Sequence, residues 1–281
     1  MRLKPAHWSV FTLITSEVLA IAVASRQLRF IEEEGIPIPE VTAGLPLVYF
    51  FSAVIIMGLA LAFLPLKMLK FIAKALFMTL YAWGVFVILA LPLPVIVAAL
   101  VAVAAALAWL RWPRLWLHNL LLGLALVGYA SVFGFLLPPV LALGLMAVIS
   151  VYDLVSVRSG HMMWMVTKLS GVNIVPAFVY PVAAGGWQMS ITDIKLDETE
   201  EKTVSLLGSG DIGFSLIIMV SVLVAGGVGA AAVMAAFLLA GLLSVYWVQK
   251  VFFKGGPTAA LPPLTVAAAL GYGLLALLSM V

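Results

Sequence analysis

Long apolar stretches alternate along this chain with short segments that carry most of its charged residues. A helix needs roughly 20 apolar residues to cross the hydrocarbon core of a bilayer, and shorter stretches depend on neighbouring helices. No stretch alternates apolar and polar residues as a barrel strand does, so the spanning elements are expected to be helices. The pattern predicts nine of them, at residues 7–24, 43–64, 75–93, 94–110, 117–137, 140–157, 208–226, 229–249 and 259–279.

The composition supports membrane residence. Of the 281 residues, 65% are hydrophobic and only 10% are charged, whereas a soluble domain has roughly 45–50% apolar and about 25% charged residues. The surplus apolar surface has to face lipid. Cysteine is absent, which excludes disulfides, thiolate metal sites and a cysteine nucleophile. A net charge of +3 is too small to indicate nucleic-acid binding. The sequence therefore predicts an all-α, multi-pass membrane protein with one membrane domain, residues 1–281.

The basic residues predict the orientation of the nine helices. With this division, only Arg26 and Arg29 of the 15 Lys and Arg residues lie on one face of the membrane. Cytoplasmic loops carry an excess of Lys and Arg, so the opposite face is expected to be cytoplasmic. The N-terminus and the long segment 158–207 are then cytoplasmic, and the C-terminus is outside. Within that segment, 161–169 is amphipathic and 197–201 is an acidic run that we interpret as a solvated loop.

Three acids remain within or at the edge of the apolar stretches: Glu17, Asp153 and Asp211. An ionisable group there costs about 2.5–3.5 kcal/mol on insertion scales, so each is a candidate functional residue. Glu17 has no partner evident in the sequence and is interpreted as a polar packing contact or a conduit residue. Asp153 lies five residues before Arg158, which places it roughly 7–8 Å below the cytoplasmic edge.

Asp211 lies in the first turns of the following helix, so two consecutive antiparallel helices bring both aspartates to a similar depth. Two carboxyl groups that lie close together cannot both ionise at low energetic cost, so they share one proton. The ionised one can accept a proton from water while the protonated one donates to a substrate carbonyl, which hydrolyses a peptide bond without metal. Asp211 is also a suitable helix cap, and buried acids serve equally in secondary transporters and cation channels. The residues alone leave these alternatives open.

Three motifs carry a resemblance to a known family. Residues 149–157 (ISVYDLVSV) resemble the YD motif of presenilins and signal peptide peptidases, and 207–211 (LGSGD) resemble their GxGD motif. Residues 259–262 (AALP) are similar to the family's PALP sequence, with Ala259 in place of its first proline. The charge asymmetry favours the presenilin branch, and the short loops favour an archaeal homologue in a prokaryotic cell membrane.

The resemblance implies an intramembrane aspartyl endopeptidase with a presenilin-like fold and no metal or other cofactor. Asp153 and Asp211 match the catalytic pair of the family. Other positions of the three motifs would form the site and contact substrate: Tyr152, Gly208, Gly210, Ala260, Leu261 and Pro262. The implied partners are transmembrane substrates and the lipid bilayer. Accessory subunits are not expected to be needed, and homo-oligomerisation is left open.

Two further interpretations concern the rest of the chain. Residues 187–204 either order against an unwound substrate strand by edge pairing or form an ordinary loop. His7, His118 and His161 are isolated in the sequence and are interpreted as interface or loop residues. No H-E-x-x-H or G-x-S-x-G motif is present, which argues against a metalloprotease or a serine hydrolase.

Overall fold

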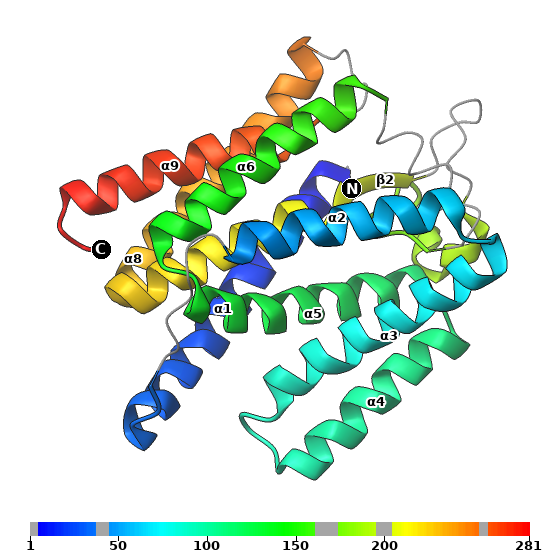
Figure 1. Ribbon diagram of the computed structural model, residues 1–281, viewed down its shortest axis with the longest axis horizontal. Coiled ribbons are helices and arrows are strands. Elements are labelled where there is room, and N and C mark those ends of the chain that lie inside the picture. The colour runs from blue at the N-terminus through cyan, green and yellow to red at the C-terminus, as the bar shows by residue number, and fades with distance from the viewer. Residues whose placement is uncertain (1–4, 38–44, 161–173, 195–203, 253–257) are drawn as a thin grey trace.

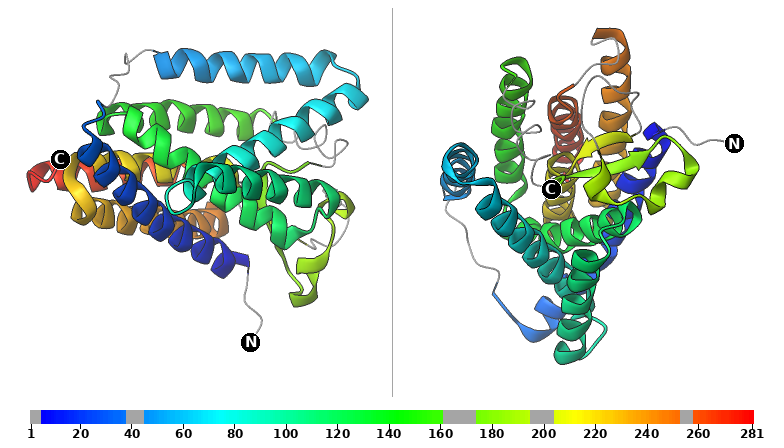
Figure 2. Two further views of the ribbon diagram at one scale, coloured as in Figure 1. Left: turned by 90° about the horizontal axis from the view of Figure 1, so that it is seen from below. Right: turned by 90° about the vertical axis from the view of Figure 1, so that its right-hand side faces the viewer.

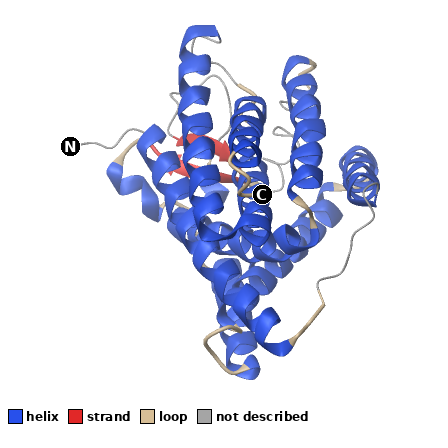
Figure 3. Ribbon diagram, turned by 90° about the vertical axis from the view of Figure 1, so that its left-hand side faces the viewer, coloured by secondary structure: helices blue, strands red, loops and turns tan. Residues whose placement is uncertain are grey.

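The computed structural model describes residues 5–37, 45–160, 174–194, 204–252 and 258–281. Most of these residues are helical, and two short strands form a small patch beside the helices (Figures 1 and 3). The helices are α1 (Pro5–Glu34), α2 (Leu45–Phe63), α3 (Leu66–Leu89), α4 (Val95–Arg111), α5 (Leu115–Leu136), α6 (Pro139–Arg158), α8 (Ser209–Phe252) and α9 (Leu261–Leu277). The strands are β1 (Ala177–Pro181) and β2 (Val204–Gly208), with short 3₁₀ turns η1 (Ala184–Gln188) and η2 (Ile191–Asp193) between them.

Prolines mark the beginnings of several helices. Pro65 precedes α3, Pro94 precedes α4, Pro139 is the first residue of α6, and Pro262 lies in the first turn of α9. The fixed φ of proline suits the first helical turn, where its missing N–H would have no partner in any case. These positions set where each apolar stretch becomes a helix.

The described helices have the length and composition of membrane spans. Five of them are long and apolar enough to cross a bilayer: α1, α3, α5, α6 and α8. Shorter apolar helices include α4 and α9. Large hydrophobic side chains on the outer faces stay exposed, for example Ile96 at 75% and Leu100 at 66%, which suits contact with lipid tails. The all-α membrane fold is thus confirmed, whereas the count of nine spans stays a prediction.

Two helices extend beyond the predicted ranges. α1 continues to Glu34, so Glu32, Glu33 and Glu34 form its last turn instead of a loop. α3 begins at Leu66, so Lys67 lies in its first turn and is not in a connecting loop. The hydropathy pattern missed both ends because charged side chains interrupt it, although their flexible stems let the charged groups reach water from a helix.

α8 comprises two helical segments. The predicted ranges 208–226 and 229–249 both lie within α8, and the two segments join at Gly227, where φ is 77° and ψ is −173°. A positive φ of this kind is readily adopted only by glycine. The two segments of α8 run in opposite directions (Figures 1 and 2).

Glycines also allow close helix packing. α8 packs against α1, α5 and α9, and α5 packs in turn against α3. Where α3 crosses α5, a Cβ on Gly84 would collide with the backbone of Ala125, and one on Gly128 would collide with the carbonyl of Gly84. Small residues at helix contacts are a common device in membranes, where close van der Waals packing stabilises association.

β1 and β2 form an antiparallel pair in which Ala177 lies opposite Gly208 and Tyr180 lies opposite Ser205. β2 runs directly into α8, so the sheet ends at the position where that helix begins. The sequence analysis did not predict β1, because its five residues (AFVYP) are too few to show a pattern. This pair is the main departure from the predicted all-helical layout.

Candidate active site

The two predicted catalytic acids come from α6 and α8. Asp153 lies in the last two turns of α6, and Asp211 lies in the first turn of α8. Both side chains are partly buried, and the two carboxyl groups are close enough for their charges to interact. The structure thus brings together residues 58 positions apart in the sequence, as two antiparallel helices were expected to do.

The segment before α9 contacts one of these acids. The backbone N–H of Leu261 donates a hydrogen bond of 3.4 Å to Oδ2 of Asp153. Leu261 and Ala260 are buried, at 2% and 7% exposure, and the hydroxyl of Thr265 donates to the Leu261 carbonyl at 2.8 Å. The third motif therefore contacts the site through its backbone, which orients the Asp153 carboxyl without a charged side chain.

Gly208 lies close to the other acid. A Cβ added at Gly208 would lie 2.8 Å from Asp211 Oδ2. A side chain of any size at this position would displace the carboxyl. By contrast, a Cβ at Gly210 would meet only Phe214 Cε2, at 4.0 Å, so the two glycines of the motif are under different constraints.

The sequence interpretation of His118 as an interface or loop residue is wrong. His118 lies in α5, is fully buried, and has a hydrogen-bond partner at each ring nitrogen. Its Nε2 lies 3.0 Å from the carbonyl oxygen of Ala177, and a carbonyl only accepts, so Nε2 carries the proton. Nδ1 then accepts the hydrogen bond from the Tyr81 hydroxyl at 2.8 Å. The histidine thereby ties β1 to α5 and α3.

The next residue of α5 reinforces this contact. The side-chain amide of Asn119 donates to the Val179 carbonyl at 2.8 Å, and its oxygen accepts from the Val179 N–H at 3.0 Å. This pair of bonds reproduces what a neighbouring strand would offer. Sequence reasoning missed both residues, although two adjacent hydrogen-bonding side chains within an apolar stretch were a usable signal.

These contacts determine which edge of the sheet is covered. Because Asn119 takes both backbone groups of Val179, those groups point away from β2. Residues directly opposite each other in an antiparallel pair share this orientation, so Leu206, opposite Val179, points its N–H and C=O to the outer edge of β2. Among the described residues, no backbone hydrogen bond outside the strand pair engages Leu206. α5 thus covers the β1 edge, whereas no backbone group in the described part of the chain pairs with the outer edge of β2.

The sheet is also fastened to the start of α8. Ser209 donates to the Pro176 carbonyl from its backbone N–H at 3.3 Å and from its hydroxyl at 2.9 Å. The position of Asp211 therefore depends on β1, which depends on α5 through His118 and Asn119. Hydrogen bonds thus connect the first turns of α5, through β1, to the start of the helix that carries Asp211.

The other residues singled out in the sequence differ in their burial and position. Tyr152 is partly buried beside Asp153, and Pro262 follows Leu261 in the first turn of α9. Glu17 is buried at 4% exposure, and no residue in the described ranges forms a hydrogen bond with its Oε1. The amphipathic stretch 161–169 and the acidic run 197–201 lie outside the described residues.

Within the described ranges, no three His, Cys, Asp or Glu side chains lie together as potential metal ligands. Among the described residues, the groups gathered at this site are two carboxyl groups and the backbone N–H of Leu261.

Comparison with known proteins gives two extended structural likenesses. No protein-family model and no curated protein matches this sequence. The chain is similar to a solved structure of a presenilin family intramembrane aspartate protease, with 23% sequence identity and a TM-score of 0.62, over 98% of this chain and 99% of that one. A second structure with the same description, in a different space group, gives 26% identity and a TM-score of 0.61 over 96% of each chain.

The fold and the paired carboxyl groups define a multi-pass membrane protein with the architecture of presenilin-family proteases. The family resemblance drawn from the three motifs is confirmed by these likenesses, which run almost from end to end. The chain is a membrane protein whose fold is similar to that of these presenilin-family structures.

Proposed function

We propose that this chain is an aspartic endopeptidase that hydrolyses peptide bonds within transmembrane helices, with Asp153 and Asp211 as its catalytic pair. The observation that carries the proposal is that these two carboxyl groups, one from α6 and one from α8, lie near enough for their charges to interact in a membrane protein of this fold. The structural neighbours are intramembrane aspartate proteases, which favours a protease over the transporter or cation-channel alternative.

The mechanism follows from two carboxyl groups that share one proton. The ionised carboxylate accepts a proton from a water molecule, and the resulting hydroxide attacks the carbonyl carbon of the substrate. The protonated carboxyl donates to the carbonyl oxygen, which stabilises the charge that develops there. As the tetrahedral intermediate collapses, the C–N bond breaks and the leaving nitrogen takes the proton that the first carboxylate had accepted from water. The Leu261 N–H keeps the Asp153 carboxyl oriented throughout.

The open edge of β2 supplies a way to present the substrate. A helical substrate hides its peptide bonds in its own hydrogen bonds, so the cleaved segment has to unwind first. An unwound segment can pair with the outward N–H and C=O of Leu206 by strand addition. β2 leads to Gly208 and Asp211 within a few residues, so such a strand would run toward the catalytic pair. This refines the edge-pairing hypothesis for residues 187–204, which placed the strand-forming region mostly before β2.

The orientation and setting of the protein are part of the same proposal. The N-terminus faces the cytoplasm and the C-terminus faces outward, in a prokaryotic and specifically archaeal-type cell membrane. The enzyme acts on transmembrane proteins without accessory subunits, and self-association into a homo-oligomer is compatible with this activity.

Cleavage of a model transmembrane peptide by the purified, reconstituted protein tests the proposal. Asp153→Asn and Asp211→Asn should each lower the rate by at least about 100-fold, because each removes a proton-transfer group. Asp193→Asn is the matched control, since Asp193 is an exposed acid in η2 whose carboxyl accepts a hydrogen bond from the Thr192 hydroxyl.

Wild-type cleavage by both single variants would refute the protease. Loss of cation flux in the same two variants, with no cleavage by the wild type, would instead support a channel or transporter.

A further inference from the structure

A groove with a volume of about 520 Å³ lies beside α1, α5 and β1. It is lined by residues of α1 and α5, by Phe178 and Tyr180 of β1, and by Trp187 of η1. Neither Asp153 nor Asp211 lines it. The groove is therefore separate from the candidate active site and has no part in the proposed hydrolysis.

The groove opens toward the bilayer. Its rim includes Phe11 of α1 and Trp116 and Leu120 of α5, which are 58%, 44% and 51% exposed. α1 and α5 also pack against each other and against α8, and no α8 residue lines the groove. It thus lies between two membrane-spanning helices, on their outward side.

The length of the groove matches half a bilayer. Along α1 the lining runs from Trp8 to Leu19, and along α5 it runs from Trp116 to Val127. Eleven residues of helix extend for about 16 Å, and one leaflet of the hydrocarbon core is about 15 Å thick. A helix of that length, roughly 10 Å across, would fill about 1,300 Å³, which is far more than the groove holds. A substrate helix does not fit, whereas an extended acyl chain does.

The lining offers little to a polar ligand or to water. Among its polar side chains, the Thr12 hydroxyl accepts from the Tyr180 hydroxyl at 2.9 Å, the Thr15 hydroxyl donates to the Phe11 carbonyl at 2.8 Å, and Asn119 is bonded to Val179. Apolar cavities stay free of water, so an opening of this kind in a membrane fills with hydrocarbon.

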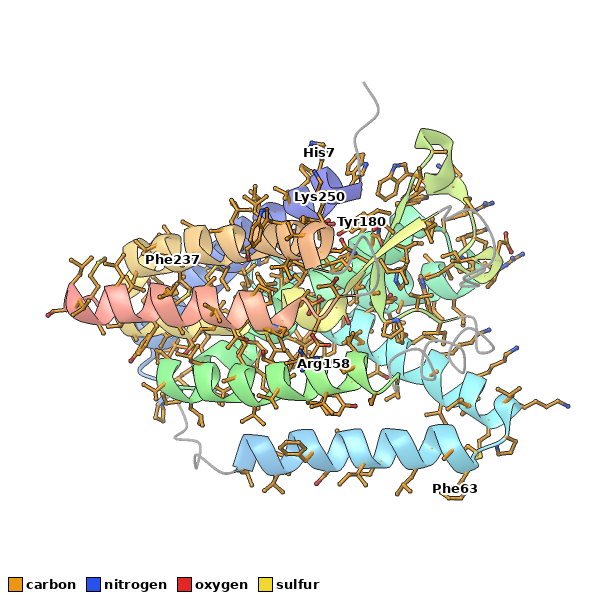
Figure 4. All side chains as sticks on the ribbon, turned by 90° about the horizontal axis from the view of Figure 1, so that it is seen from above. His7, Phe63, Arg158, Tyr180, Phe237 and Lys250 are labelled. Carbon is orange, nitrogen blue, oxygen red and sulfur yellow. The ribbon has the colours of Figure 1, made fainter. Side chains whose placement is uncertain are left out.

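Tryptophans identify the end where a head group belongs. Trp8, Trp116 and Trp187 lie at the end of the groove where α1 and α5 begin. The rings of Trp8 and Trp187 meet edge to face, with centroids 4.9 Å apart. Tryptophan concentrates at the level of lipid head groups. Tyr180 lies toward the same end of the molecule as His7 (Figure 4), and burial raises the pKa of its hydroxyl, so it stays protonated and keeps its bond to Thr12.

We propose that this groove holds one phospholipid, with its head group beside Trp8, Trp116 and Trp187 and an acyl chain between α1 and α5 in contact with Phe178. The lipid packs on the face of β1 that carries Phe178 and Tyr180, whereas Asn119 bonds to the β1 edge. The site does not depend on the proposed protease activity, and its test uses no cleavage measurement.

Gly123 allows the groove to be filled selectively. A Cβ added there would lie 3.8 Å from Phe178 Cε1 and 3.9 Å from Ser16 Oγ, which are ordinary contacts, so a larger side chain grows into the groove. Gly144 of α6 is the matched control, because a Cβ there meets nothing within 4 Å and the position is exposed on another helix. Both Gly123→Leu and Gly144→Leu add the same atoms to a membrane-facing helix.

Native mass spectrometry of the full-length protein, extracted from bilayers of defined phosphatidylglycerol and phosphatidylethanolamine, measures the retained lipid. The wild type and Gly144→Leu should keep one phospholipid per chain after detergent exchange, and Gly123→Leu should keep at least threefold less. If Gly123→Leu fails to fold, Leu120→Trp on the exposed rim should give the same loss.

Three results would overturn the proposal. They are a wild type that carries no phospholipid, equal retention by the groove-filling and control variants, and a retained molecule that proves to be a peptide. A photoreactive phospholipid gives a second readout. Its cross-links should fall on residues 8–19 or 116–127, and cross-links confined to other helices would contradict the site.

Discussion

At the residue scale, the short distance between Gly208 and Asp211 leaves too little room for a Cβ atom at position 208. A methyl group at position 208 would lie 2.8 Å from Asp211 Oδ2, closer than real Cβ contacts allow, and Oδ2 belongs to a carboxyl that also has to stay near Asp153. The carboxyl would therefore rotate or shift rather than simply tolerate its new neighbour.

Gly208→Ala should accordingly lower the cleavage rate by about 10- to 100-fold, the effect of displacing a reacting group by a fraction of an ångström to an ångström. Thermal unfolding should change little. Gly210→Ala is the internal control, because its new methyl group would meet only Phe214 at 4.0 Å. Equal rates for the two alanine variants would show that the Asp211 carboxyl is not confined by residue 208.

Some residues of the candidate site could be predicted from the sequence, and others could not. Asp153 and Asp211 were identifiable because a carboxyl group within an apolar stretch is rare and needs an explanation. The roles of His118 and Asn119 were not, because their partners Ala177 and Val179 lie about 60 positions away in a strand of five residues. Local pattern carries no information about a partner that only the tertiary fold brings near.

At the element scale, α5 acts as a substitute strand for β1. Replacing Asn119 by Leu removes both hydrogen bonds to Val179 and leaves the backbone groups of that residue unpaired. The loss should reduce the free energy of unfolding by about 1–3 kcal/mol, and cleavage should fall because β2 and Asp211 lose their support.

Hydrogen–deuterium exchange locates this effect. In Asn119→Leu, the amide of Val179 should exchange much faster, and the amides of α9 should not change. Leu120→Ala, on the exposed neighbouring position, should leave β1 protected. Faster exchange throughout the molecule would mean that Asn119 supports the whole fold and has no special role at β1.

The crossing of α3 and α5 gives a second prediction for an element. Gly84 and Gly128 bring the two backbones so close that no Cβ fits between them. Gly84→Val should therefore separate the helices and lower stability by about 1–3 kcal/mol or more. Gly58→Val of α2, where a Cβ would meet nothing within 4 Å, is the control in a thermal unfolding measurement. Equal midpoints for the two variants would refute tight packing at the crossing.

The ends of the elements were less predictable than their presence. The sequence pattern located the apolar part of α1 and α3 but ended one at residue 24 and began the other at 75, whereas these helices reach Glu34 and Leu66. Hydropathy measures which residues tolerate lipid, and a helix can continue into water beyond them. The turn at Gly227 was easier, because a cluster of glycines between two apolar stretches has few other uses.

At the scale of the whole molecule, the absence of cysteine makes the orientation directly testable. In intact cells that express the Ile36→Cys variant, a membrane-impermeant maleimide should label the new cysteine, because Ile36 follows α1 on the face predicted to be outside. In cells that express the Ser159→Cys variant, the cysteine should be labelled only after the membrane is permeabilised. Both positions are exposed, so access to reagent is the only intended difference, and the reverse pattern would invert the proposed topology.

The open edge of β2 has one more consequence, which concerns the resting protein. An unpaired strand edge is a template for any extended chain, including a second copy of the same edge. The four acids Asp197, Glu198, Glu200 and Glu201 stand just before β2 in the sequence. Each copy carries these four negative charges next to β2 in the sequence, so like charges oppose the approach of two copies, and flanking charges of this kind are a known guard against aggregation. The acidic run then has a use that requires no ligand, because it discourages self-pairing while leaving the edge available to substrates without such a cluster.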